Sequence, residues 1–194
     1  MLSDAARKAG NIDALINNAA VFHKDGLMAV TERKFMAELR VNFMAPAVLM
    51  REFARIVIDR SQKTGGAPSG KVVNLLDRRI AGAEAGCLPY LLSKKMLAEF
   101  TRSSALELAP YVTVNGVAPG AILPPPVKKG PGKPGKGRGV TAITRDLAGT
   151  IPLKRKCSVN DVAEAVIFLL ESDGITGQVI YVDGGQHLLG SDVG

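Results

Sequence analysis

The chain has 194 residues, of which 46% are hydrophobic, and its formal net charge is +7 at neutral pH. This length suffices for one α/β domain with a buried core but not for two, and no apolar run approaches the roughly 18 residues that cross a membrane. The first residues, MLSDAARKAGNID, carry charges where a signal peptide needs an apolar core, so we expect a cytoplasmic protein without membrane association.

The positive charge is concentrated in one segment. KKGPGKPGKGR, at 128–138, contains five lysines and arginines, which account for most of the excess. The charge therefore indicates a basic loop and not a basic face, and we expect no nucleic-acid partner. The two cysteines and two histidines lie far apart, without metal-ligand spacing, so neither a disulfide nor a metal site is predicted.

Apolar runs alternate with helical patterns along the chain. Four short runs rich in β-branched residues predict strands, at 13–17, 71–76, 112–117 and 178–182. Helices are predicted from about 31 to 60, with a kink at Pro46, and from 89 to 109. A third helix begins where Ser158 and Asp161 can form a capping box. The alternation predicts right-handed βαβ units and an open parallel sheet with helices on both faces.

Two loop segments interrupt this pattern. GGAPSGKV, at 65–72, approaches a phosphate-binding P-loop but lacks the final Ser/Thr and precedes a strand, so we interpret it as a surface turn. The Pro/Gly/Lys-rich segment 124–150 follows the third predicted strand. Ligands of open α/β sheets bind beyond the carboxyl ends of the strands, which makes this segment a candidate flexible lid over a substrate.

Tyr90 and Lys94 are spaced for proton chemistry. Residues four apart share a helix face, and a nearby lysine lowers the pKa of a phenol from about 10, producing a general acid for a group that has received hydride. The alternative is an ordinary solvated helix face. The neighbouring segments favour a proton-transfer role over a solvated helix face, because this helix follows a buried strand. Two other predicted strands end at the same edge of the sheet, at Asn17-Asn18 and at Pro119-Gly120.

Several motifs occur in the order and spacing of a known family: NNAA (17–20), Asn42 in RVNF, Tyr90 with Lys94, VNGVAPG (114–120) and ITGQVIYVDGG (175–185). Over nearly its whole length the chain resembles the short-chain dehydrogenase/reductase family. The resemblance implies a Rossmann-type sheet and an NAD(P)(H)-dependent enzyme that transfers hydride to or from a small-molecule substrate, with Tyr90 as proton donor. Lys94 would bind the nicotinamide ribose, and Asn42 would hold a water that links Lys94 to a proton relay. The implied cofactor contacts are Asn17, Asn18, Ala19, Tyr90, Lys94, Pro119, Gly120 and Ile122.

The chain departs from the family at Asp77, which stands 13 residues before Tyr90, where the family has a serine. An ionised carboxylate there repels a developing oxyanion and raises the pKa of Tyr90. It fits a substrate with N–H groups and a C=N bond, and the pattern is similar to the pteridine reductase and dihydromonapterin reductase branch, which favours NADP over NAD. Two alternatives stay open: a carbonyl or alcohol dehydrogenase in which Asp77 is incidental, and an inactive subunit, acting as an interaction module, in which Asp77 caps a loop. Spacing does not explain Arg78 and Arg79, and Cys87 is interpreted as a pocket-lining thiol.

The second departure concerns the cofactor half of the fold. The NNAA motif begins at residue 17, and nothing before it resembles the Gly-rich phosphate-binding turn or the acidic or basic cofactor selector. We therefore expect residues 1–194 to form a single partial Rossmann-type domain that lacks the first βαβ half. Such a chain is either a truncated reductase or a short protein that assembles with a partner, and alone it should bind NADPH poorly. The helices at 31–60 and 89–109 are the predicted homo-oligomer face.

Overall fold

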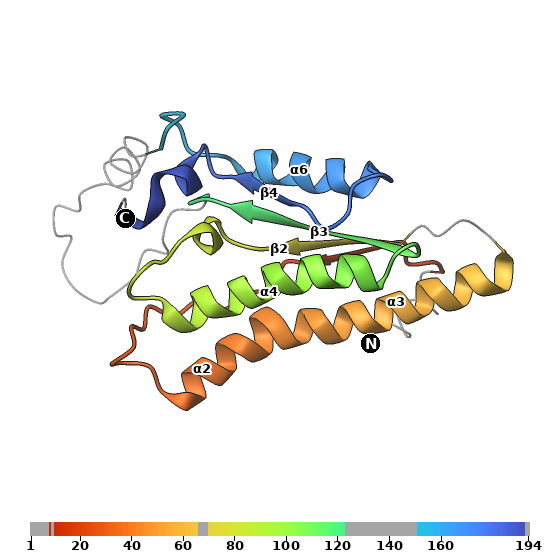
Figure 1. Ribbon diagram of the computed structural model, residues 1–194, viewed down its shortest axis with the longest axis horizontal. Helices are drawn as coiled ribbons and strands as arrows, with labels where there is room; N and C mark the ends of the chain where they lie inside the picture. The colour runs from red at the N-terminus through yellow and green to blue at the C-terminus, as the bar shows by residue number, and fades with distance from the viewer. Residues whose placement is uncertain (1–7, 9, 66–69, 123–150, 193–194) are drawn as a thin grey trace.

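The protein folds around a parallel sheet. The structure, a computed structural model, describes residues 8, 10–65, 70–122 and 151–192 (Figure 1). Four parallel strands lie in the order β1-β2-β3-β4: β1 (Ala14–Asn17), β2 (Gly70–Leu75), β3 (Val112–Pro119) and β4 (Val179–Val182). The predicted α/β class is confirmed.

Helices cover both faces of this sheet, as predicted. One face carries α3 and α4, and the opposite face carries α6 (Figure 1). The α-helices are α2 (Glu32–Leu39), α3 (Ala45–Thr64), α4 (Leu88–Glu107) and α6 (Val159–Glu171). A π-helix (Arg40–Met44) joins α2 to α3, and 3-10 turns span Arg78–Ala81 and Gln186–Asp192.

The core explains why the strand sequences are apolar without alternation. Val72 of β2 packs into a cluster with Phe53 of α3, whereas its neighbour Val73 packs into a second cluster with Leu169 of α6. Successive strand residues point to opposite faces, and both faces are covered by helices. Every apolar residue of such a strand therefore finds a partner.

The predicted long helix at 31–60 is interrupted where the sequence indicated a break. α2 ends at Leu39, and α3 begins at Ala45 with Pro46 in its first turn, where the missing N–H of proline leaves no hydrogen bond unmade. The interruption itself is a π-helix, and it precedes Pro46 instead of centring on it. The predicted capping box of α6 is confirmed by its two hydrogen bonds, Asp161 N to Ser158 Oγ at 3.1 Å and Ser158 N to Asp161 Oδ2 at 2.6 Å.

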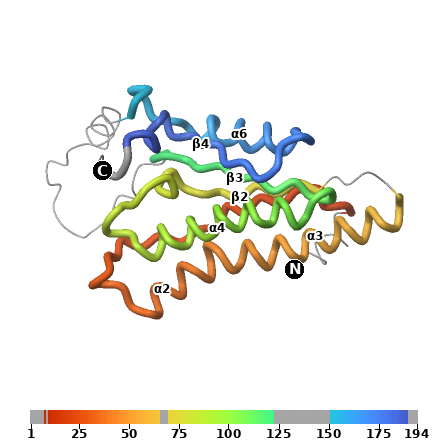
Figure 2. The backbone as a smooth tube through the Cα atoms, in the orientation of Figure 1, coloured from red at the N-terminus to blue at the C-terminus, as the bar shows by residue number. Residues whose placement is uncertain are grey.

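The carboxyl ends of β1, β2 and β3, the start of α4 and the whole of α2 lie at the same end of the molecule (Figure 2). Of the predicted loops, the lid at 124–150 and most of the turn at 65–72 fall outside the described residues. In the part of the chain that the structure describes, no helix is long and apolar enough to span a membrane.

Candidate active site

Tyr90 and Lys94 lie in the first two turns of α4, and both side chains are buried. The chain reaches α4 directly from the carboxyl end of β2, and Pro89 occupies the first turn of the helix. Lys94 Nζ donates a hydrogen bond to the carbonyl of Leu75, the last residue of β2, at 2.6 Å. The ammonium is thereby fixed 6.0 Å from the centroid of the Tyr90 ring.

Asp77 faces Tyr90 across the end of β2. It is the N-cap of the 3-10 turn Arg78–Ala81, and its Oδ1 accepts the backbone N–H of Arg79 at 2.9 Å. Its Oδ2 accepts the hydroxyl proton of Tyr90 at 2.9 Å. The cap fixes the carboxylate, so the sequence-predicted Asp77, Tyr90 and Lys94 are brought together in one site.

The structure supplies the explanation for Arg78 and Arg79 that the sequence lacked. Arg79 Nη1 lies 3.0 Å from Asp77 Oδ2, and Arg79 Nε lies 2.7 Å from Glu84 Oε1. Arg78 Nη2 lies 3.5 Å from the other oxygen of Glu84. Burial opposes the charge of Arg79, but the carboxylates of Asp77 and Glu84 raise the pKa of its guanidinium above the ordinary value. Arg79 therefore bridges two carboxylates, and it neutralises Asp77 at Oδ2, the oxygen that also accepts the hydroxyl of Tyr90.

Tyr90 has a pKa well above the ordinary value of about 10 for a phenol. Burial contributes most, followed by the charge of Asp77 and by the hydrogen bond to that carboxylate, while Arg79 offsets part of the increase. The expectation that Lys94 lowers the pKa of Tyr90 is wrong in this structure, whereas the opposing effect expected of Asp77 is confirmed. Tyr90 is consequently protonated at neutral pH.

Lys94 also titrates away from its ordinary range. Burial lowers the pKa of Lys94 from 10.5 to about 8, and the carboxylates of Asp77 and Glu38 oppose this decrease. Among the described residues, no carboxylate lies within ion-pair distance of the Lys94 nitrogen, whose hydrogen bond goes to Leu75. The ammonium therefore depends on carboxylates at longer range for its charge.

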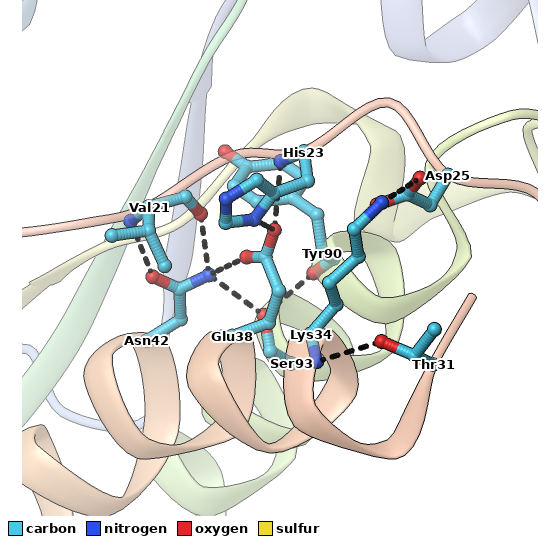
Figure 3. Close-up of polar contacts among 9 residues, drawn as sticks. All are labelled: Val21, His23, Asp25, Thr31, Lys34, Glu38, Asn42, Tyr90 and Ser93. Atoms are coloured by element: carbon cyan, nitrogen blue, oxygen red, sulfur yellow. Dashed lines mark hydrogen bonds and ion pairs between the residues drawn. The ribbon is translucent and has the colours of Figure 1, made fainter. Parts of the chain in front are cut away.

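Asn42 lies in the middle of the π-helix, and its side chain is fully buried. Its Oδ1 accepts the N–H of Val21 at 2.8 Å, and its Nδ2 lies within 3.0 Å of Val21 O, Glu38 Oε2 and Ser93 Oγ (Figure 3). These bonds connect the segment after β1 to α2 and α4. Single turns of π-helix are frequent at functional sites. The water-holding role of Asn42 stays a prediction.

The predicted cofactor contacts occupy the carboxyl ends of β1 and β3. After β1, Asn18 and Ala19 are exposed, while the side chain of Asn17 is buried and donates to Asn74 Oδ1 at 2.8 Å. Asn74 in turn donates to Thr101 of α4 at 2.9 Å. The side chain of Asn17 thus has a structural partner, and its contact with a cofactor stays a prediction.

On the other side of the site, Pro119 ends β3, and Gly120 and Ile122 are half-buried. A lysine carries three N–H donors, and Leu75 accepts one of those of Lys94. The remaining donors and the accessible backbone at both strand ends suit the hydroxyl and amide groups of a nicotinamide riboside. The residues present therefore fit the nicotinamide riboside part of the cofactor that the sequence implied.

Phe22 belongs to the site, although sequence reasoning missed it. Its side chain is 45% exposed, and its ring meets Tyr90 edge-to-face, with 4.7 Å between the centroids. The guanidinium of Arg79 lies 5.8 Å from the centroid of the Phe22 ring. An aromatic residue close behind Asn17-Asn18, in a chain with 5% aromatic residues, was the available signal. Phe22 offers a flat apolar face beside Tyr90.

Glu38 is the second residue that sequence reasoning missed. Its side chain is completely buried, and Glu38 Oε1 accepts the backbone N–H of His23 at 2.7 Å (Figure 3). The imidazole Nδ1 of His23 lies 2.8 Å from the same oxygen. The available signal was the spacing of four residues between Glu38 and Asn42 on a predicted helix.

The other candidate groups give no reactive site. Cys87 is buried, and burial, followed by the charge of Glu84, raises the pKa of its thiol, so it is a poor nucleophile. The described residues contain no group of three side chains that could hold a metal ion. A hollow of about 360 Å³ lies away from Tyr90; it is an apolar groove lined by residues of α3 and of α4 with its C-cap, including Val48, Phe100 and Leu108.

Known proteins resemble this chain over most of its length. A family model described as enoyl-(acyl carrier protein) reductase matches residues 1–187. Pteridine reductase 1 of Leishmania tarentolae is 31% identical and aligns with 92% of this chain and 64% of its own length. Galactitol 2-dehydrogenase of Agrobacterium fabrum is 28% identical, with 92% of this chain and 70% of its own length covered.

A solved structure shares the fold. FolM alternative dihydrofolate reductase 1 from Brucella canis, complexed with NADP, superposes with a TM-score of 0.81 at 29% sequence identity. The superposition covers 97% of this chain and 68% of that protein. The chain thus spans 64–70% of the length of these three proteins.

Proposed function

Because the chain belongs to the short-chain dehydrogenase/reductase family, we propose that it is an NAD(P)H-dependent reductase of a pterin-like or other heterocycle with a C=N bond. One observation carries this proposal: the hydroxyl of Tyr90 donates to Asp77 Oδ2 at 2.9 Å. Burial and the carboxylate keep the phenol protonated but make it a weak acid, so it can give its proton only to a strongly basic atom, such as the nitrogen that forms when hydride adds to a C=N bond. The same phenol is not available as a phenolate base for an oxidation.

Reduction of a C=N bond adds hydride to carbon and a proton to nitrogen. The hydride would come from the nicotinamide of bound NADPH. Lys94 would hold the ribose of this cofactor, and the exposed chain at Asn18 and the half-buried Gly120 would flank it. Tyr90 gives its proton to the nitrogen and takes its replacement from solvent.

Asp77 favours this substrate class over a ketone. Its carboxylate can accept an N–H of a heterocycle, while its negative charge disfavours the oxyanion that forms when a carbonyl is reduced. Arg79 partly neutralises the carboxylate at Oδ2, which lowers the cost of its burial. The exposed ring of Phe22 provides a stacking face for a planar ring system.

The relatives support the substrate and the cofactor. One relative at 31% identity is a pteridine reductase, and the structural neighbour at a TM-score of 0.81 is a dihydrofolate reductase complexed with NADP. Both names describe enzymes of fused pyrimidine heterocycles. We therefore propose NADPH as the cofactor, with NADH as the alternative.

The test is a comparison of substrates and variants. Because the chain alone is expected to bind NADPH poorly, calorimetry first measures the dissociation constant. NADPH oxidation is then measured at NADPH concentrations above this constant, with a dihydrobiopterin-type substrate and with a panel of ketones. Asp77→Ser should lower kcat/KM for the heterocycle at least about tenfold, which corresponds to one lost charge-assisted hydrogen bond, and should spare or improve ketone reduction. Asp59→Ser is the control, because it makes the same substitution at an exposed residue near the C-terminal end of α3. Faster turnover of ketones than of heterocycles by the unmodified protein would refute the substrate assignment.

We also propose that two copies associate through α3 and α4. The outer surface of these helices exposes large apolar side chains, among them Met44, Val48, Met96 and Leu106. The apolar groove of about 360 Å³ lies on the same surface. An exposed apolar patch with a groove marks a contact surface, and self-association through one shared patch is the commonest solution for a soluble chain.

A further inference from the structure

The carboxylate of Glu38 is buried behind the catalytic residues and is not used in the proposed reaction. Its side chain is completely inaccessible to water, although Glu residues are almost never fully buried unless paired. It lies on α2, one turn before Asn42, and faces the loop after β1 and the start of α4 (Figure 3). A carboxylate buried in this position needs hydrogen-bond donors or positive charges that stabilise its negative charge.

Three N–H groups surround the Glu38 carboxylate. Oε1 receives the backbone N–H of His23 and lies 2.8 Å from its imidazole, and Oε2 accepts Asn42 Nδ2 at 2.8 Å. Among the described residues no lysine or arginine lies within 4.0 Å of it, and the imidazole of His23 is charged only when protonated. The negative charge of Glu38 is therefore only partly balanced by its direct contacts.

A buried positive charge lies on the helix that Asn42 contacts. Asn42 Nδ2 also donates to Ser93 Oγ at 3.0 Å, and Ser93 precedes Lys94 in α4. Lys94 is buried with a carbonyl partner, and it lacks a direct counter-ion in the described part of the chain. The Glu38 carboxylate is thus connected through Asn42 to the neighbour of the buried Lys94 in α4.

We propose that Glu38 is a positioning residue of the site, whose carboxylate fixes the side chain of Asn42 and whose negative charge keeps the Lys94 ammonium protonated. The proposal rests on the reductase function proposed above for its consequence in turnover, but the charge coupling itself can be measured without a cofactor. Asp77 has the larger electrostatic effect on Lys94, and it shares its charge with Arg79 at 3.0 Å. Glu38, which has no lysine or arginine within 4.0 Å among the described residues, adds to this effect.

The titration of Lys94 agrees with this arrangement. The groups that act on it are Asp77 and Glu38, which both favour the ammonium, against the dominant effect of burial, which lowers the pKa of Lys94 to about 8. Glu38 also contributes to the raised pKa of Tyr90. The same carboxylate therefore favours the protonated forms of both catalytic groups.

The decisive measurement separates charge from shape. Glu38→Gln keeps the size of the side chain and one carbonyl acceptor for Asn42 but removes the charge. Glu38→Asp keeps the charge, and Glu32→Gln changes an exposed glutamate of the same helix as a matched control. Each protein is labelled with ¹⁵N and ¹³C in its lysines and titrated by NMR without cofactor, and the Lys94 signal is identified by its absence in Lys94→Met.

Glu38→Gln should lower the midpoint of the Lys94 NMR titration by about 0.5 to 1 pH unit, which is the effect expected when one charge that is partly screened from Lys94 is removed. Glu38→Asp and Glu32→Gln should stay close to the unmodified protein. A folded Glu38→Gln protein with an unchanged Lys94 midpoint would overturn the proposal, because a merely structural glutamate would leave the ammonium unaffected.

If Glu38→Gln does not fold, His23→Gln answers the same question. It leaves the carboxylate in place and removes its titratable partner, so the Lys94 midpoint should stay or rise, and a decrease would overturn the coupling. In turnover, Glu38→Gln should move the basic limb of the kcat profile to lower pH by the same shift. Absence of heterocycle reduction by the unmodified protein would refute the proposed function and leave the NMR result standing.

Discussion

Lys94 provides a prediction that does not depend on the substrate: Lys94→Met should abolish reduction and yet stabilise the fold at neutral pH. The pKa of the buried ammonium falls from 10.5 in an ordinary environment to about 8 in the folded protein. A difference of roughly 2.5 units corresponds to about 3 kcal/mol of unfavourable burial. Methionine has a similar length and no charge, but it leaves the Leu75 carbonyl without its donor, which costs about 1–3 kcal/mol. The expected net gain at pH 7 is about 1 kcal/mol.

The stability difference between Lys94→Met and the unmodified protein should depend on pH, whereas a difference in packing alone would not. Below pH 8 Lys94 is charged in both the folded and the unfolded chain, so the full penalty applies. Above pH 8 the folded protein releases the proton, while the unfolded chain keeps it up to about 10.4, and the unmodified protein therefore gains stability. The difference in unfolding free energy should consequently change by about 2 kcal/mol between pH 7 and pH 9.5, so that Lys94→Met, more stable than the unmodified protein by about 1 kcal/mol at pH 7, is less stable by about 1 kcal/mol at pH 9.5.

Urea denaturation at pH 7 and pH 9.5 measures both quantities. Lys95→Met is the matched control, because the neighbouring lysine is only half-buried, and its effect should not change with pH. A Lys94→Met protein whose difference in unfolding free energy from the unmodified chain is the same at both pH values would show that the ammonium is not held in an unfavourable environment.

Three further predictions concern the surroundings of the site. Asp77→Asn should lower the pKa of Tyr90, because the carboxylate charge helps to raise it. The pKa is followed by the ultraviolet absorbance of the phenolate during a pH titration, with Tyr90→Phe as the blank, and an unchanged titration curve would contradict the prediction. Arg79→Gln should destabilise the fold by about 1–3 kcal/mol in urea denaturation by leaving a partly buried carboxylate unpaired, and Arg102→Gln, in an exposed ion pair, should change little. Leu106→Lys, at a side chain that is 82% exposed on α4, should reduce the mass measured by light scattering to that of a monomer, unless the contact surface lies elsewhere.

The sequence was informative about the sheet because burial on both faces leaves a simple pattern. The run at 13–17 predicted β1 (Ala14–Asn17), and the run at 112–117 predicted all but the last two residues of β3 (Val112–Pro119). The π-helix Arg40–Met44 was not predictable in the same way. Its register is associated with hydrogen bonds that Asn42 makes to Val21 and Ser93, and such contacts depend on where distant segments lie.

The composition of the site was predictable, whereas its electrostatics were not. Helix spacing and the shared edge of a parallel sheet brought Asp77, Tyr90 and Lys94 together as expected. The direction of the Tyr90 pKa required the structure, because burial dominates it and because the Lys94 ammonium is bonded to the Leu75 carbonyl. Spacing along the chain does not reveal how deeply a side chain is buried.

The charges around Tyr90 keep its hydroxyl protonated. Asp77 and Glu38 both raise the pKa of the phenol, and each has a nitrogen partner of its own, Arg79 for the first and His23 for the second. These partners reduce the cost of burying the carboxylates. A site that needed a phenolate base for oxidation would require the opposite, a cation nearer than any carboxylate. Tyr90 therefore holds its proton before a substrate arrives, which agrees with the proposed reduction.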